Sequence, residues 1–147
     1  MSWAPQQVQI SIYNRLTADS ALMVLLGTTV AGTQKVFDHV PDNTDFPFVV
    51  IESKPWEDRG SHNTEGLSSE FAIHSWYQPG TSGFTGRGDK QIQLIQQRID
   101  QLLHKYALVI SGWNNLGLRR SVINILTEPD NVTKHGIQNF KLLIGEQ

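Results

Sequence analysis

Apolar side chains recur every three or four residues in two parts of the chain, the spacing of one face of an α-helix. The longer part covers residues 89–106, and its opposite face is rich in glutamine and nearly uncharged. The shorter part covers residues 5–16 and begins with a proline, which a first helical turn accepts. Asp19 can then cap a brief second helix that ends at Gly27. The pattern therefore predicts a short N-terminal helical pair and one long amphipathic helix.

β-Branched and aromatic residues gather in the remaining segments, as expected of strands. Residues 67–77 alternate between two faces, which is typical of an antiparallel strand. Residues 47–52 form a nearly continuous apolar run, typical of a strand that is covered on both faces. Further strands are predicted at residues 35–40, 108–110, 116–126 and 133–144, with a turn at residues 112–115.

The order of these elements is two helices, three strands, one helix and three strands, which predicts an α+β fold. We expect a mainly antiparallel sheet of about five to six strands, with the long amphipathic helix packed on one face. No repeat, low-complexity tract or linker interrupts the 147 residues. A single domain spanning residues 1–147 is the expected organisation.

Two long polar segments connect the predicted elements. Residues 53–66 have no periodicity, and residues 78–88 carry four glycines. Loops of this length inside a compact domain are usually functional, so we expect both to contact partner proteins. Trp56 stands in the first loop without apolar neighbours, and exposed aromatic residues are enriched in protein interfaces. A loop that folds back and buries Trp56 on its own domain explains the residue equally well.

Composition bears on the class of partner. Charged residues make up only 18% of the chain and the net charge is −2, a balance that argues against broad binding of nucleic acid or anionic membranes. The low charge suggests that part of the surface faces protein rather than water. Cysteine is absent, which excludes disulfides and thiolate metal sites. With no signal-peptide pattern and no apolar run long enough to cross a bilayer, we expect a soluble, cytosolic protein without a membrane partner.

A search for catalytic patterns finds little. The five histidines have no metal-binding spacing, and neither a nucleophile elbow nor a phosphate-binding P-loop is present. The glycine-rich segment at residues 78–88 is more consistent with a flexible loop than with a phosphate site. We assign no catalytic, cofactor-binding or metal-binding residue. A small enzyme with an unrecognised site near Glu70, His74 or His135 stays as an alternative.

Several motifs follow one another in a fixed order. Residues 16–27 contain a short leucine-rich helix, residues 37–41 read FDHVP, and residues 46–51 read FPFVVI. The long strand then ends in SWY at residues 75–77, and a late Thr-x-His-Gly motif lies within residues 130–136. In this order, from about residue 8 to residue 144, the chain resembles the small tail-completion and tail-terminator proteins of long-tailed bacteriophages.

This resemblance implies a fold similar to that of the phage lambda tail terminator and a structural role without catalytic residues. Proteins of this kind form a hexameric ring on the head-proximal end of the tail tube. The ring ends tube polymerisation and presents a surface to the head connector, and DNA passes through it without specific binding. The resemblance thus implies a virion protein of the tail that is assembled in the cytoplasm of the bacterial host. The chain departs from many relatives in its longer loop at residues 78–88 and at residues 113–115.

The loops and the glutamine-rich helix face supply the candidate interface residues, which are expected to contact neighbouring copies, the tail tube protein or the connector. They are Trp56, Glu57, Asp58, Arg59, Phe84, Arg87, Gln93 and Gln97. The main alternative function is that of another head–tail joining or neck protein, which would share the size, the composition and the partners of a terminator.

Overall fold

A computed structural model describes residues 3–29, 32–79 and 88–147 of the chain. The helices are α1 (Ala4–Thr17), α2 (Ser20–Leu26) and α3 (Lys90–Leu103). The strands are β1 (Val36–Phe37), β2 (Phe48–Asp58), β3 (Gly66–Tyr77), β4 (Trp113–Thr127) and β5 (Lys134–Glu146). The expected α+β class, the short N-terminal helical pair and the long helix are confirmed.

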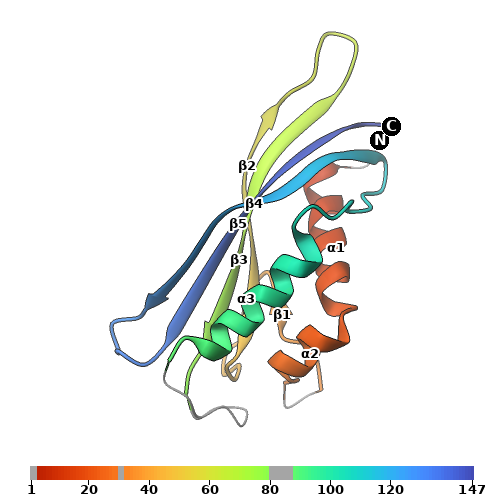
Figure 1. Cartoon of the computed structure of the whole chain (residues 1–147). Helices are drawn as coiled ribbons and strands as arrows, with labels where there is room; N and C mark the ends of the chain where they lie inside the picture. Colours follow the sequence, from red (N-terminus) through yellow and green to blue (C-terminus); the bar gives the residue numbers. More distant parts are fainter. Residues whose placement is uncertain (1–2, 30–31, 80–87) are drawn as a thin grey trace.

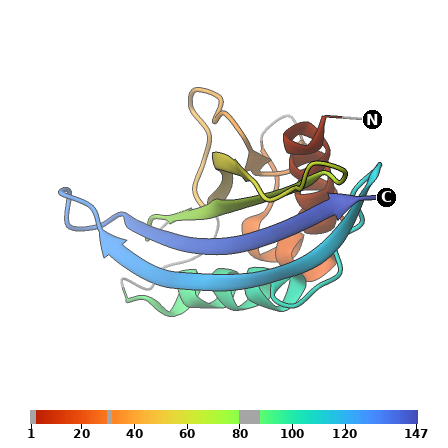
Figure 2. The same ribbon diagram turned by 90° about the horizontal axis from the view of Figure 1, so that it is seen from above.

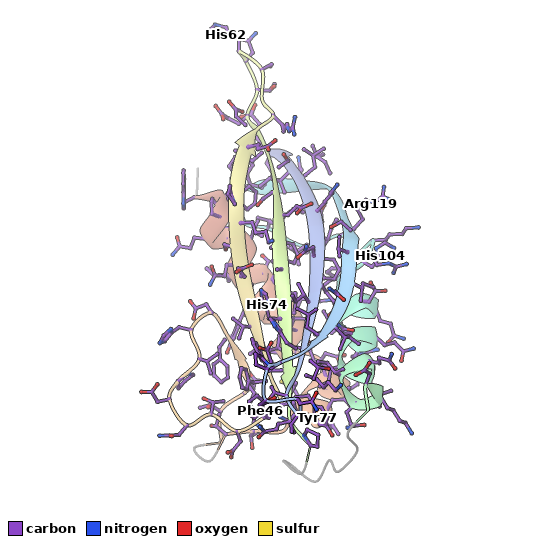
Figure 3. All side chains as sticks on the ribbon, turned by 90° about the vertical axis from the view of Figure 1, so that its left-hand side faces the viewer. Phe46, His62, His74, Tyr77, His104 and Arg119 are labelled. Atoms are coloured by element: carbon purple, nitrogen blue, oxygen red, sulfur yellow. The ribbon has the colours of Figure 1, made fainter. Side chains whose placement is uncertain are left out.

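The five strands form one sheet in the order β1-β2-β3-β5-β4. Only β1 and β2 run parallel, and the other pairs are antiparallel. The three helices lie against one face of the sheet, while the opposite face carries no helix of the described residues (Figures 1 and 3). We call this second side the open face. The long strands β4 and β5 bend along their length (Figure 2).

The polar segment at residues 53–66 is not a loop, and that prediction is wrong. Strand β2 continues to Asp58 and pairs with the start of β3, so that only residues 59–65 turn the chain. Within the turn, the Arg59 N–H donates to the Gly66 carbonyl at 2.8 Å, and the Ser61 N–H donates to the Thr64 carbonyl at 2.8 Å. Backbone pairing with β3 satisfies the polar backbone groups of this segment. The hairpin projects beyond the sheet (Figure 1), and residues 57–65 are exposed.

Three further predicted boundaries are corrected. Residues 108–110 make a single isolated bridge, between Ile110 and Trp113, rather than a strand. Leu108 and Ile110 are buried in the core, whereas Val109 between them is 80% exposed, and this alternation produces the same pattern as a strand. Strand β4 already begins at Trp113, so the predicted turn at residues 112–115 is wrong as well. The strand expected at residues 35–40 shrinks to the two residues of β1.

The core lies between the helices and the sheet, and helix α3 is its centre. Ile92, Ile95 and Ile99 are buried where α3 crosses β3, β5 and β4. Gln96, which the periodicity placed on the exposed polar face, is also buried. Its side-chain Nε2 donates to the Asn124 carbonyl of β4 at 3.1 Å, and its backbone carbonyl accepts a bond from Gln138 Nε2 of β5 at 2.9 Å. These two bonds tie α3 to both strands.

Gly136 leaves room for side chains of α3 where β5 passes beneath the helix. A Cβ added at this position would lie 2.6 Å from Gln96 Nε2 and 3.1 Å from Ile92 Cδ1. The glycine of the Thr-x-His-Gly motif is thus explained by the close approach of a strand to a helix.

Asp19 links the N-terminal helices to α3. Its carboxylate accepts a bond from the Leu22 N–H at 2.8 Å, which caps α2, and it receives two further bonds from the Arg98 guanidinium. The bonded guanidinium holds the pKa of Asp19 below its usual value, although burial of the carboxyl opposes the effect. One side chain therefore closes a helix end and joins two helices.

We expect Asp19→Ala to lower the free energy of unfolding by about 2 kcal/mol, because the variant loses both the cap and the charged pair. Asp19→Asn keeps an acceptor for the cap and loses only the charge, so its loss should be roughly half as large. Chemical denaturation of the wild type and both variants measures the difference. Equal stability of all three proteins would contradict the linking role of Asp19.

Candidate interaction surfaces

Three of the expected interface residues lie at the projecting end of the β2–β3 hairpin. Glu57, Asp58 and Arg59 are all exposed. Glu57 pairs with Arg59 at 2.6 Å, and Arg59 Nε also donates to the Ser68 hydroxyl at 3.0 Å. Asp58 accepts a bond from the Gly60 N–H at 2.8 Å. The hairpin end, where Figure 3 labels His62, thus presents an ordered, polar surface to solvent.

Trp56 points to the other side of the same hairpin. It pairs with Ser69, whose side chain faces the helices, and its half-buried ring packs against the hydrophobic core. Residues of α1 and Trp56 line the same narrow crevice. The arrangement favours the interpretation that Trp56 packs on its own domain, while a contact with a partner stays a prediction.

The remaining interface candidates lie elsewhere. Gln93 and Gln97 are exposed on α3, which crosses the sheet on the helix side, away from the projecting hairpin (Figure 1). Phe84 and Arg87 lie outside the described residues, as does most of the glycine-rich loop. The candidates therefore do not form one continuous site. They divide between a hairpin end and a helix face.

The open face carries a group of rings that the sequence did not reveal. His135 of β5 stacks on Trp76 of β3, with ring centroids 3.7 Å apart and planes 10° from parallel. His74 Nδ1 lies 2.7 Å from His135 Nε2, and Phe48 of β2 continues the stack beyond Trp76. Sequence spacing could not indicate the histidine pair, because its members are 61 residues apart.

Two carboxylates flank the histidine pair. Glu128 Oε1 lies 3.2 Å from His135 Nδ1, and Glu52 Oε1 lies 3.3 Å from His74 Nε2. In one arrangement with both rings neutral, His135 Nδ1–H donates to Glu128 and His135 Nε2 accepts a hydrogen bond from His74 Nδ1–H. Burial lowers the pKa of His135, and the charge of His74 lowers it further, whereas Glu128 and Glu52 oppose the shift. A proton added at His135 Nε2 would break the bond to His74.

These residues bear on the enzyme alternative. Glu70 is directed toward Lys141, at 3.9 Å, rather than toward the histidines. Within the described part of the chain, no three His, Asp or Glu side chains are placed to hold a metal ion.

None of the described helices is both long and apolar enough to cross a membrane.

The β4–β5 end of the sheet is a second projecting region (Figure 1). Val122, Ile123 and Leu126 of β4 leave 51%, 50% and 44% of their surfaces exposed. The turn that follows is held by Asp130, which accepts bonds from the N–H groups of Val132 and Thr133 at 2.9 and 2.8 Å. The Asp and Thr of the late motif therefore close this turn, and exposed apolar residues beside it are suited to contact with protein.

Hairpins project from both ends of a one-sided sheet, with exposed apolar side chains on β4, an arrangement suited to contact with other proteins. The model of the family Tail completion protein gp17 matches residues 10–145. The chain belongs to this family and is a structural protein of the bacteriophage tail.

Among solved structures, the fold is similar to that of a chain in the virion of a native gene transfer agent (GTA) particle. The TM-score is 0.80 at 18% sequence identity, and the likeness covers 99% of each chain. A comparison with curated proteins gave no match. The expected relationship to phage tail-completion proteins is thus confirmed.

Replacement of Trp56 separates the two interpretations of this residue. Because the ring is half-buried against the core, we expect Trp56→Ala to lower the free energy of unfolding by about 2 kcal/mol, part of the loss for a fully buried aromatic. Its exposed neighbour supplies the control: Glu57→Ala should change stability by less than about 0.5 kcal/mol. Chemical denaturation measures both. If Trp56→Ala leaves stability unchanged, the indole ring does not pack on its own domain, and its contact with a partner is favoured instead.

The histidine pair predicts a loss of stability in acid. An unfolded histidine binds its proton near pH 6.5, while folded His135 binds it only at lower pH. Between these values the unfolded chain holds more protons, so stability is full above about pH 6.5 and falls as the pH is lowered. We expect His135→Phe, which keeps a ring on Trp76, to lose less melting temperature than the wild type between pH 7.5 and 5.5.

The exposed His62 provides the control for this measurement. His62→Gln should leave the pH dependence of the melting temperature as it is in the wild type. Identical curves for the wild type and His135→Phe would show that the pair does not control the acid response.

Proposed function

We propose that the protein caps the head-proximal end of the tail tube as a hexameric ring. In this role it ends tube polymerisation and provides the surface to which the head attaches. The family match over residues 10–145 carries the proposal, and the fold likeness to a virion chain over 99% of its length supports it. The proposed place of assembly is the cytoplasm of the host bacterium.

A cap between tube and head needs two different contact regions, one for each partner. The projecting ends of the β2–β3 and β4–β5 hairpins lie at opposite ends of the sheet (Figure 1). One end is charged, with Glu57, Asp58 and Arg59 exposed, and the other places exposed Leu126 beside a polar turn. The difference in chemistry suits two different partners, which we propose to be the tail tube protein and a connector or neck protein.

DNA would pass through such a ring without specific binding. A net charge of −2 gives no general attraction to phosphate. A role in binding and assembly, rather than in catalysis, agrees with this balance and with membership of a structural family.

Particles made without this protein test the proposal. Electron microscopy should show tubes of abnormal length, because polymerisation continues when nothing caps the growing end. Tails of normal length that fail to join heads would instead assign the protein to the head–tail joining class. Normal, infectious particles would contradict both functions.

Solution mass offers a second measurement. A complete ring contains six copies of the 16.5 kDa chain, about 99 kDa, and co-purification with tails in the absence of heads favours the terminator. Co-purification with heads alone favours the joining protein.

A further inference from the structure

We infer that neighbouring copies join head to tail through two particular surfaces at opposite edges of the sheet. The first is the β4 edge surface, formed by Lys105, Leu116 and Arg119. The second is the α1 groove, whose walls include Ile10, Tyr13 and Asp38. The inference rests on the proposed ring, and it names the surfaces that close it.

A closed ring of identical subunits requires two different, complementary surfaces on each copy. Strands β1 and β4 are the two edges of the sheet, and α1 packs beside β1. Figure 3 shows Arg119 at one edge and α1 toward the other. The two surfaces are therefore placed so that the edge of one copy meets the groove of the next.

Copies do not join by continuing the sheet along the middle of β4, because its backbone is already bonded. The Lys105 N–H donates to the Leu118 carbonyl at 2.9 Å, and the Arg120 N–H donates to His104 Nδ1 at 3.1 Å. Further along, the Asn124 carbonyl accepts a bond from Gln96. The contact between copies must then be made by side chains, so the chemistry of the exposed side chains decides what fits.

The α1 groove is a hollow of about 660 Å³ between α1 and β1. Ile10 and Tyr13 leave 44% and 40% of their surfaces exposed along it, and glutamine and asparagine side chains complete its lining. Asp38 stands at its wall, where it accepts a bond of 3.3 Å from the Gln9 amide. The groove offers apolar contact together with a negative charge.

The β4 edge surface has the opposite charge. It borders a hollow of about 470 Å³ and includes Leu116, which is 61% exposed. Lys105 and Arg119 are exposed, and neither forms an ion pair with any residue that the structure describes. Arg119 lies opposite Lys141 in the strand register, and Lys141 already has Glu70 at 3.9 Å. An acidic residue of another copy would supply the counter-charge for Arg119.

Negative charge is concentrated on the side of the α1 groove. Residues 38–45 hold three aspartates and no lysine or arginine. Asp38, Asp42 and Asp45 are exposed and make no ion pair within the described ranges. Lys35, the nearest cation along the chain, is 1% exposed and directed toward the Phe46 carbonyl.

This charge distribution favours a head-to-tail contact between copies over a contact between two identical surfaces. Two β4 edges brought together would place cations against cations, and two α1 grooves would place acids against acids. Only the edge of one copy against the groove of another pairs opposite charges, with Leu116 directed toward Ile10 and Tyr13. Electrostatic complementarity of this kind fixes register and disfavours wrong pairings.

The absence of cysteine from the chain permits a clean crosslinking test. Leu116→Cys and Ile10→Cys, introduced together, supply the only two thiols of each copy. A short bis-maleimide crosslinker is applied to assembled particles that carry this variant, and the products are separated by mass under denaturing conditions. We expect a ladder of covalent oligomers that extends to the closed ring.

Matched variants control for chance contacts. Leu116→Cys alone and Ile10→Cys alone should remain monomers, and a mixture of the two should stop at dimers. Leu116→Cys combined with Val24→Cys, at a residue of α2 that is 80% exposed, should give no ladder. Thermal melting confirms that each variant folds, which is expected because all three residues are exposed.

A charge exchange gives an independent measurement. Asp38→Lys and Arg119→Glu should each reduce the yield of rings, and the double variant should restore it.

Two results of the crosslinking test would overturn the assignment of surfaces. The first is no ladder from the double cysteine variant in normal particles, and the second is dimers from one single variant alone. If the wild-type protein does not enter the particles at all, the proposed function fails instead.

Discussion

The packing of helix α3 against the centre of the sheet is the contact on which the rest of the molecule depends. Three isoleucines fill the space between the helix and strands β3, β4 and β5, and Gln96 adds a bond to β4 and accepts one from Gln138 of β5. The approach is close enough that a side chain in place of Gly136 would displace side chains of the helix. Because α3 and the N-terminal helices bury one face of the sheet only, the opposite face, the edges and the hairpin ends remain at the surface.

This one-sided construction separates stability from assembly. The residues that hold the fold together lie in the layer between the helices and the sheet, whereas the residues suited to partners lie at the margins of the sheet. Hairpin ends of different chemistry face opposite directions, and the two edges carry charges of opposite sign. A subunit of this form can present a different surface to each of several neighbours while its core stays the same.

The sequence predicts the parts of the fold whose burial is periodic. Helix α3 and strand β3 are found near their expected bounds because one side of each is apolar and the other polar. The continuation of β2 through Trp56 to Asp58 could not be found in this way, since its pairing with β3 satisfies the backbone without apolar alternation. Residues 108–110 misled for a different reason, because Leu108 and Ile110 are buried on either side of the exposed Val109, as in a strand, although the segment makes only one isolated bridge. Of the candidate surfaces, the exposed charges of the hairpin and the glutamines of α3 could be predicted, but the His74–His135 pair depends on strand register that local spacing does not contain.

The bonds that occupy the outer backbone of β4 also protect the free subunit. An open strand edge is a template for uncontrolled growth of a sheet, which leads to fibrils. Here His104 and Lys105, directly after α3, cover the middle of that edge. On the other side, Pro55 lies in the part of β2 that extends beyond its pairing with β1. The covered part of the β4 edge therefore cannot add a strand from another chain, and contacts there must be made by side chains.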